Sequence, residues 1–193
     1  MSFLTGTNTE LLYASTSAGT AKNTFTTEVQ INDTTGMGVQ FHLPADFWLP
    51  NKAQVGRGIR VVARGIVSTT ASPTMTFTLR SGAAGNTTSA ILLGSAALTG
   101  ANTTNSIWEY QGDVVLTSIG AAGTNSTVQG VGSVVSSGFT TIVNALYGSA
   151  ASPGTIATLD TSITNYLNFN AACSVSAAGN SITIQQLLVY GLN

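Results

Sequence analysis

The stretch Thr74-Met75-Thr76-Phe77-Thr78-Leu79-Arg80 alternates polar and apolar residues without a break. Because successive side chains of a β-strand point to opposite faces, Met75, Phe77 and Leu79 share one face and the threonines the other. The pattern predicts a half-buried strand. Similar patterns cover residues 25–31, 39–43, 59–67, 90–98, 108–116, 127–135, 155–159, 167–175 and 182–189. The sequence therefore predicts nine or ten strands.

The segments between these strands carry turn-forming residues. They are residues 33–36 (DTTG), 81–86 (SGAAGN), 120–123 (GAAG), 152–154 (SPG) and 177–180 (AAGN). Glycine, proline and asparagine suit positions that need a positive or a fixed φ. Short strands joined by such turns predict an all-β fold, an antiparallel β-sandwich of jelly-roll type, with residues 23–193 in a single domain. Residues 44–49 could form one helical turn, and residues 140–147 a short helix or a strand.

The N-terminal segment differs from the rest of the chain. Its apolar residues are islands among small polar ones, and they are Phe3, Leu4, Leu11, Leu12 and Tyr13. This composition suits an extended arm that becomes ordered only against another surface. We therefore expect residues 1–22 to form an arm, with Leu4, Leu11, Leu12 and Tyr13 as candidates for binding a partner. An edge strand of the same sheet is the alternative.

Few residues of the chain are charged. Asp, Glu, Lys and Arg make up 7% of the 193 residues, against about 25% in an ordinary domain. The net charge of -1 offers no basic surface to nucleic acid, and a net charge near zero promotes association, so we expect an oligomer. No apolar run approaches the ~20 residues of a membrane span. The start of the chain lacks the pattern of a secretory signal, which predicts synthesis in a cytoplasm without export.

Residues suited to metal binding or catalysis are scarce. His42 is the only histidine and Cys173 the only cysteine, so no set of converging His and Cys ligands is available for a metal. We interpret His42 as a satisfied structural histidine. Cys173 lies on the apolar phase of its strand and is interpreted as a buried thiol, with a reactive thiol as the alternative. No G-x-S-x-G motif presents a nucleophilic serine. We expect neither a cofactor nor an enzymatic activity.

Two carboxylates and two arginines share strand faces. Glu109 and Asp113 lie about 13 Å apart at ~3.3 Å per residue, which exceeds the roughly 5–9.5 Å between glycosidase carboxylates. They are expected to be solvated or to lie at a subunit contact. Arg60 and Arg64 share a strand face close to Arg57. In a chain with six basic residues, we expect these arginines to pair with the scarce carboxylates, for example across a subunit contact. An ordinary exposed face is the alternative.

The remaining candidates for functional residues are two tryptophans and two pairs of glycines. Trp108 is in phase with Tyr110 and is predicted to lie in the core. Trp48 lies in a loop beside two prolines and is the better candidate for an exposed anchor that binds a partner. The runs Gly130-Val131-Gly132 and Gly36-Met37-Gly38 do not complete a nucleotide-binding motif. We interpret them as turn or bulge glycines.

The C-terminal segment of the chain resembles a known group of proteins. Residues 159–193, LDTSITNYLNFNAACSVSAAGNSITIQQLLVYGLN, together with the small polar composition of the whole chain, resemble the jelly-roll structural proteins of tailed bacteriophages. In that group a strand of alternating Asn and apolar residues (167–175 here), a turn with Gly179-Asn180 and a last strand (181–190 here) recur in capsid decoration proteins and fibre-like appendages. The resemblance implies a homotrimer of jelly rolls that caps or cements a virion shell. Its N-terminal segment would contact the major capsid protein or another virion protein.

The sequence thus predicts a non-enzymatic virion structural protein, a trimeric capsid decoration or cement protein made in the host cytoplasm. The main alternative is a tail-fibre or spike domain that recognises a host surface glycan through loop residues such as Trp48. A glycan depolymerase that uses inter-subunit carboxylates, and a cellular surface-layer or adhesin domain, are further alternatives.

Overall fold

The computed structural model describes residues 9–48, 56–85, 87–121, 125–140, 143–147 and 156–192 of the chain. The elements in these ranges are β1 (Thr9–Ala14), β2 (Lys22–Asn23), β3 (Val29–Gln30), α1 (Thr34–Met37), β4 (His42–Leu43), β5 (Gly58–Ser68), β6 (Thr74–Gly82), β7 (Ala90–Ser95), β8 (Leu98–Thr99), β9 (Ser106–Ser118), β10 (Ser126–Ser136), β11 (Val143–Tyr147), β12 (Ile156–Leu159), β13 (Asn165–Cys173) and β14 (Ser181–Leu192).

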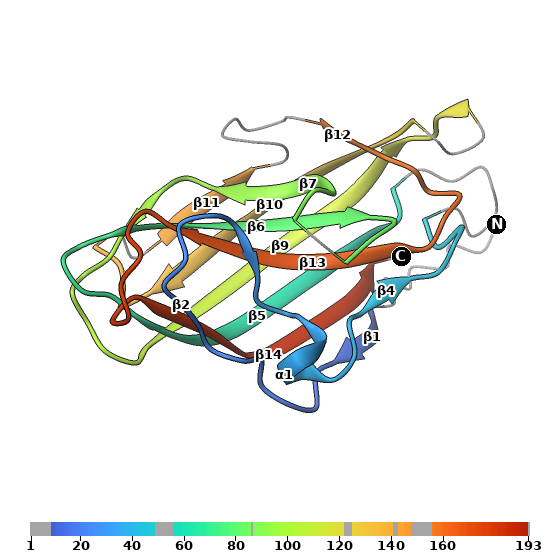
Figure 1. The fold of residues 1–193 in the computed structure, drawn as a ribbon. Coiled ribbons are helices and arrows are strands. Elements are labelled where there is room, and N and C mark those ends of the chain that lie inside the picture. The colour runs from blue at the N-terminus through green and yellow to red at the C-terminus, as the bar shows by residue number, and fades with distance from the viewer. Residues whose placement is uncertain are drawn as a thin grey trace.

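The strands form two antiparallel layers packed face to face (Figure 1). One layer has the strand order β1-β14-β5-β9-β10-β11 and the other β7-β6-β13-β3. A short pairing of β11 with β7 joins the two layers at one side. The predicted antiparallel β-sandwich is therefore confirmed, while its jelly-roll type stays a prediction.

Two of the long ladders join segments that are far apart in the sequence. β5 pairs with β14, and β6 pairs with β13 in the opposite layer. The connections β5 to β6 and β13 to β14 both carry the chain from one layer to the other (Figure 1). The sandwich is thus held by contacts between the middle and the end of the chain, which favours slow folding.

Most predicted strands are present, with shifted ends. Residues 25–31 and 39–43 contribute the short strands β3 and β4, and residues 90–98 are divided between β7 and β8. Residues 143–147, for which a helix and a strand were both open, form β11. Residues 44–48 form a turn, in which the Phe47 N–H donates to the Pro44 carbonyl at 3.1 Å. One short helix, α1, occupies the predicted turn at residues 33–36.

Gly130 and Gly132 lie inside β10, so their interpretation as turn or bulge glycines is wrong. A Cβ atom at Gly130 would lie 2.6 Å from Leu93 Cδ2, and one at Gly112 in β9 would lie 2.4 Å from Leu93 Cδ1. Leu93 itself has no exposed surface. These strand glycines make room for a core leucine of the opposite layer.

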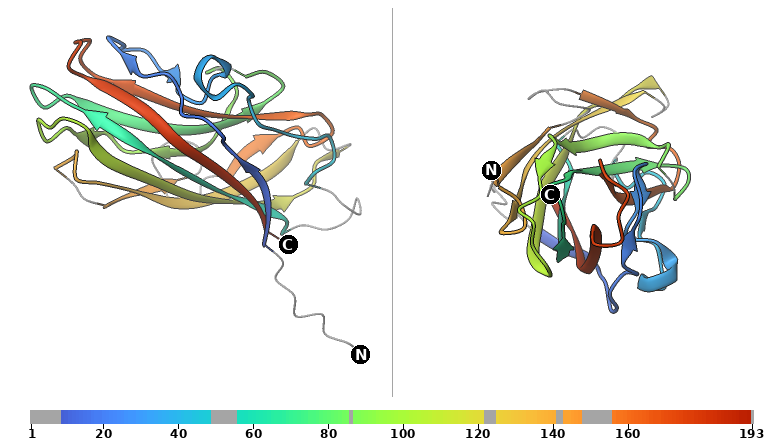
Figure 2. Two further views of the ribbon diagram at one scale, coloured as in Figure 1. Left: turned by 90° about the horizontal axis from the view of Figure 1, so that it is seen from below. Right: turned by 60° about the vertical axis from the view of Figure 1, so that its left-hand side comes forward.

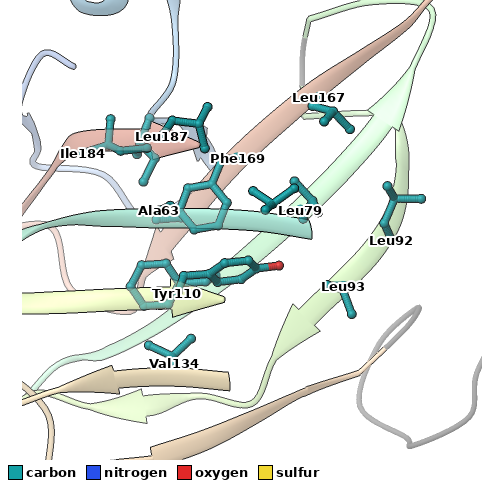
Figure 3. Close-up of a cluster of buried hydrophobic side chains, with 14 of the residues drawn as sticks. Ala63, Leu79, Leu92, Leu93, Tyr110, Val134, Leu167, Phe169, Ile184 and Leu187 are labelled. Carbon is teal, nitrogen blue, oxygen red and sulfur yellow. The ribbon is translucent and has the colours of Figure 1, made fainter. Parts of the chain in front are cut away.

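An aromatic cluster fills the space between the layers. Figure 3 shows Phe169 of β13 and Tyr110 of β9 facing each other, with ring centroids 4.6 Å apart in an edge-to-face arrangement. Trp108 stacks on Phe169 at 5.8 Å, which confirms its predicted place in the core. Burial raises the pKa of the Tyr110 hydroxyl well above its ordinary value. Cys173 is also buried, as predicted.

Residues 9–14 form β1, which pairs with β14 as an edge strand (Figure 2). This corresponds to the edge-strand alternative rather than to a separate arm. Leu12 and Tyr13 pack against the core, and the Tyr13 hydroxyl donates to the Val39 carbonyl at 3.2 Å. Leu11 points to the outside and is 53% exposed. Leu4 lies outside the described residues.

The outer side of β13 is covered by the segment that contains β3. Asn168 and Asn170, the polar residues of the alternating pattern, have no exposed surface. Gln30 Nε2 donates to Asn168 Oδ1 at 3.3 Å. Asn32 Nδ2 donates to the Leu167 carbonyl at 2.9 Å. These asparagines therefore bind the covering segment to the sheet, because buried amides need hydrogen-bond partners.

Glu28 is the charged centre of this polar layer. Arg80 donates from Nε and Nη2 to its two carboxylate oxygens at 2.7 Å each, and Asn170 Nδ2 donates at 2.9 Å. Thr78 Oγ1 also donates to Glu28. Burial alone would raise the pKa of Glu28, but the hydrogen bonds from Arg80, Thr78 and Asn170 outweigh it and hold the pKa below its usual value.

Acid should therefore weaken the fold through Glu28. Because the folded pKa lies below the unfolded value of about 4.3, the contribution is complete above that pH and is lost as the pH falls through the folded pKa. Glu28→Gln should cost stability at neutral pH, and the difference from the unsubstituted chain should shrink as the pH falls from about 6 to about 3. Urea unfolding at a series of pH values measures this. Glu109→Gln is the control, because the ion pair of Glu109 is more exposed to solvent. A difference in unfolding free energy between Glu28→Gln and the unsubstituted chain that stays constant with pH would contradict the prediction.

Candidate interaction surface

The residues singled out in the sequence do not gather at one site. Trp48 has no exposed surface and packs edge-to-face on Phe47 with ring centroids 5.6 Å apart. The expectation of an exposed anchor at Trp48 is wrong, because the turn at residues 44–48 directs both rings inward. Arg57 lies over the Phe47 ring at 4.1 Å and donates to the Phe47 carbonyl at 2.6 Å. Burial lowers the pKa of Arg57.

His42 lies on the surface, with its ring 5.4 Å from that of Tyr166. Within the described ranges, no group of three or more His, Cys, Asp or Glu residues could hold a metal ion. Across the same ranges, no helix has the length and apolar character needed to cross a membrane.

The surface that stands out is the outer side of the layer formed by β1, β14, β5, β9 and β10, which we call the outer face. Antiparallel register aligns its outward side chains in rows across the strands. One row contains Leu11, Tyr190, Arg60, Asp113 and Val131.

The next rows along the strands follow the same register. The second row contains Leu188, Val62, Gln111 and Ser133; the third contains Gln186, Arg64, Glu109 and Val135; and the fourth contains Thr183, Ile66 and Ile107.

Two ion pairs lie at the centre of the outer face. Arg60 donates from Nε and Nη2 to the two Asp113 oxygens at 2.7 Å each. Arg64 Nε donates to Glu109 Oε2 at 2.6 Å and Arg64 Nη1 to Gln186 Oε1 at 2.9 Å. Hydrogen bonding to Asp113 raises the pKa of Arg60. The predicted pairing with the scarce carboxylates is confirmed for Arg60 and Arg64, and it occurs within the chain. It is wrong for Arg57, which donates to the Phe47 carbonyl instead.

These pairs contribute little to the stability of the isolated chain. The arginine side chains are 39% and 44% exposed and the carboxylates 30% and 42%. Ion pairs this close to solvent are worth about 0–1 kcal/mol. Their two positive and two negative charges cancel, so these pairs give the outer face no net charge. The charges are nevertheless ordered, with the arginines on β5 and the carboxylates on β9.

Exposed apolar side chains surround the charges. Among the described residues, six large apolar side chains are exposed, and four of them lie on the outer face: Leu11 (53%), Ile107 (70%), Val131 (64%) and Val135 (41%). Only Leu11 was a candidate from the sequence. Ile107, Val131 and Val135 could have been recognised from the sequence, because each is an apolar residue at an otherwise polar, outward-facing position of its strand. Ile107 precedes Glu109 by two residues, and Val131 follows Gln129 by two residues.

The outer face is also hollowed beside Val131. A hollow of about 260 Å³ is lined by Asp113, Val115, Thr117, Gln129, Gly130 and Val131. A second hollow of about 180 Å³ adjoins it at Asp113 and Val131. The surface therefore has relief into which a protruding side chain could fit.

Comparison with known proteins adds the following. No protein-family model matches the chain, and no curated protein sequence matches it. Among solved structures, the fold is similar to the CBM2 module of the evolved Dit protein of Lactobacillus casei BL23 phage J-1, with a TM-score of 0.36 and 15% sequence identity over 97% of each chain. Fold and surface together define an antiparallel β-sandwich with a patterned outer face.

Proposed function

We propose that this protein is a non-enzymatic structural component of a virion, made in the host cytoplasm, which decorates or cements a shell by contact with other proteins. The observation that carries the proposal is the outer face, where exposed Val131 and Ile107 surround charges that already cancel. Such a surface can be buried against a protein without leaving an unpaired charge. The resemblance of residues 159–193 to structural proteins of tailed phages supports the virion as the setting.

The proposed mechanism depends on contact area. Copies of the protein associate, as homotrimers by the resemblance, and bind the major capsid protein or another virion protein. Burial of apolar surface at ~25 cal/mol per Å² over an interface of ordinary size can clamp neighbouring subunits of a shell. Because Leu12 and Tyr13 pack against the core, docking in the described part of the chain is assigned to Leu11 and the outer face. Leu4 stays a proposed contact.

A tail-fibre or spike domain that binds a host glycan is the second candidate. The hollows on the outer face favour it, since Asp113, Gln111 and Gln129 place hydrogen-bonding groups beside Val131. Sugars are bound through such groups together with an apolar surface. Trp48 is excluded from this role by its burial.

A glycan array and a decoration assay separate the two candidates. We expect the purified protein to bind no glycan above background. Added to shells that lack it, the protein should bind at full occupancy and raise the temperature at which the shells open, and Val131→Lys should reduce that occupancy. Reproducible glycan binding that is lost in Gln129→Ala would favour the receptor-binding candidate instead. Absence of the protein from micrographs of the assembled particle would overturn the virion proposal.

A further inference from the structure

We propose that the outer face binds the outer face of a second copy of this chain, about a twofold axis that runs parallel to the strands between β5 and β9. This goes beyond the proposed function and does not depend on it, because it concerns the free protein. A twofold contact buries the same patch on both copies, so the patch must be complementary to itself.

The charges of the outer face have this self-complementarity. Arg60 and Arg64 lie on β5, and their register partners Asp113 and Glu109 lie on the adjacent strand β9. Rotation about an axis parallel to the strands keeps each row in place and exchanges β5 with β9. Arg60 of one copy then lies opposite Asp113 of the other, and Arg64 lies opposite Glu109.

The same charges disfavour the other in-plane twofold axis. An axis perpendicular to the strands keeps each strand in place and exchanges the rows. Arg60 would then lie opposite Arg64, and Asp113 opposite Glu109. Like charges opposite each other disfavour association, so the charge pattern selects the axis parallel to the strands.

The apolar side chains agree with this axis. Exchange of β14 with β10 places Tyr190 of one copy opposite Val131 of the other, and exchange of β5 with β9 places Ile66 opposite Ile107. Val131 and Ile107 are the two most exposed apolar side chains of the outer face. Tyr190 also lies opposite the larger hollow, whose lining includes Val131.

The dimensions of the outer face suit a dimer of modest affinity. Because the axis lies between β5 and β9, the two faces overlap over four strands, β14, β5, β9 and β10. At about 4.8 Å per strand and with about ten residues at ~3.3 Å, these strands cover roughly 600 Å² per copy, somewhat below the ~800 Å² of a standard interface. Aligned sheets pack about 10 Å apart, a gap that the long arginine side chains can span. A threefold contact joins two different patches, whereas the twofold contact joins the same patch on both copies. The mass of the free protein therefore distinguishes this dimer from the homotrimer that the resemblance implies.

The first test replaces an apolar residue of the outer face. Val131→Lys should raise the dimer dissociation constant roughly tenfold or more, because it places a charge opposite Tyr190. Val39→Lys is the matched control, since Val39 is 66% exposed but lies outside the outer face. Sedimentation equilibrium over a range of concentrations measures both variants, and thermal unfolding verifies their fold.

The second test exchanges the charges and keeps every ion pair of the folded chain. The variant with Arg60→Asp, Asp113→Arg, Arg64→Glu and Glu109→Arg should dimerise with itself, because each opposed pair is still of unlike charge. Mixed dimers with the unsubstituted chain would place arginine opposite arginine and carboxylate opposite carboxylate. Native mass spectrometry of the mixture should show mixed dimers below their statistical share.

Four outcomes would overturn this proposal. They are an unsubstituted chain that stays monomeric at its highest soluble concentration, a Val131→Lys variant that associates like the unsubstituted chain, an equal effect of Val39→Lys, and mixed dimers at or above their statistical share. None of them bears on glycan binding or on the presence of the protein in a particle, so the proposed function stands or falls separately.

Discussion

Gly65→Ala should lower the free energy of unfolding by about 3 kcal/mol. Gly65 lies in β5 between two long strands, and a Cβ atom there would lie 1.9 Å from the Thr183 carbonyl oxygen and 2.8 Å from Trp108 Cζ2. The oxygen belongs to the backbone of β14, so no side-chain rotation can relieve the overlap. Either β14 moves away from β5 or the ladder between them is distorted.

Gly94→Ala is the matched control for this prediction. Gly94 is also a buried strand glycine, in β7, but a Cβ atom there would meet its nearest neighbours, Ile91 Cγ2 and Thr78 Cγ2, at 3.8 Å. That is ordinary contact, and alanine restricts the unfolded chain, so the change should be neutral or stabilise by up to about 1 kcal/mol. Urea unfolding of both variants measures the difference. Equal stability of the two variants would refute the backbone overlap at Gly65.

The ladders around Gly65 also show what the sequence could and could not predict. Alternation located nearly every long strand, because burial of one face imposes a period of two on each strand by itself. β1 was foreseen only as the edge-strand alternative, because its consecutive apolar residues Leu11, Leu12 and Tyr13 show no alternation. β2 was missed, because two residues are too few to show a period. Which strands pair is a property of distant segments, and nothing in a local pattern states that β5 lies between β14 and β9.

The same limit applies to the candidate surface. The arginines of β5 and the carboxylates of β9 were each recognised on one strand face, and their pairing was expected from the scarcity of charge. The partners and the outer face follow only once the register Arg60 to Asp113 and Arg64 to Glu109 is known. Trp48 was misplaced for a related reason: flanking prolines indicate a loop but do not indicate where its side chains point.

The asparagines of β13 show how a local pattern can mislead about exposure. The alternation of Asn168 and Asn170 with apolar residues is typical of a strand with one solvated face. Both side chains are buried, because the segment around Gln30 and Asn32 covers them. Gln30 Nε2 donates to Asn168 Oδ1, and Asn170 Nδ2 donates to Glu28. Distinguishing a solvated polar face from a covered one requires tertiary contacts.

A substitution on the apolar side of β13, at Phe169, should also have a large effect on stability. Phe169→Ala should lower the free energy of unfolding by about 3–5 kcal/mol, which combines lost burial with the cavity left behind. Phe169 has no exposed surface. Its ring centroid lies 5.8 Å from that of Trp108, 6.1 Å from that of Phe77 and 4.6 Å from that of Tyr110. These residues come from both layers, since Trp108 and Tyr110 lie on β9 and Phe77 lies on β6.

Phe169→Leu separates the loss of volume from the loss of the ring. Leucine keeps most of the buried volume, so its cost should stay near or below about 1.5 kcal/mol, unless the aromatic contacts themselves add about 0.5–1.5 kcal/mol each. Urea unfolding followed by the fluorescence of the tryptophans measures both variants, and the emission of Trp108 should change in the folded state because its stacking partner is lost. If Phe169→Ala costs no more than Phe169→Leu, the cavity is refilled by neighbouring side chains and the aromatic cluster does not hold the layers together. A cost for alanine at least twice that for leucine would show that Phe169 joins the two layers by filling the space between Trp108 and Tyr110.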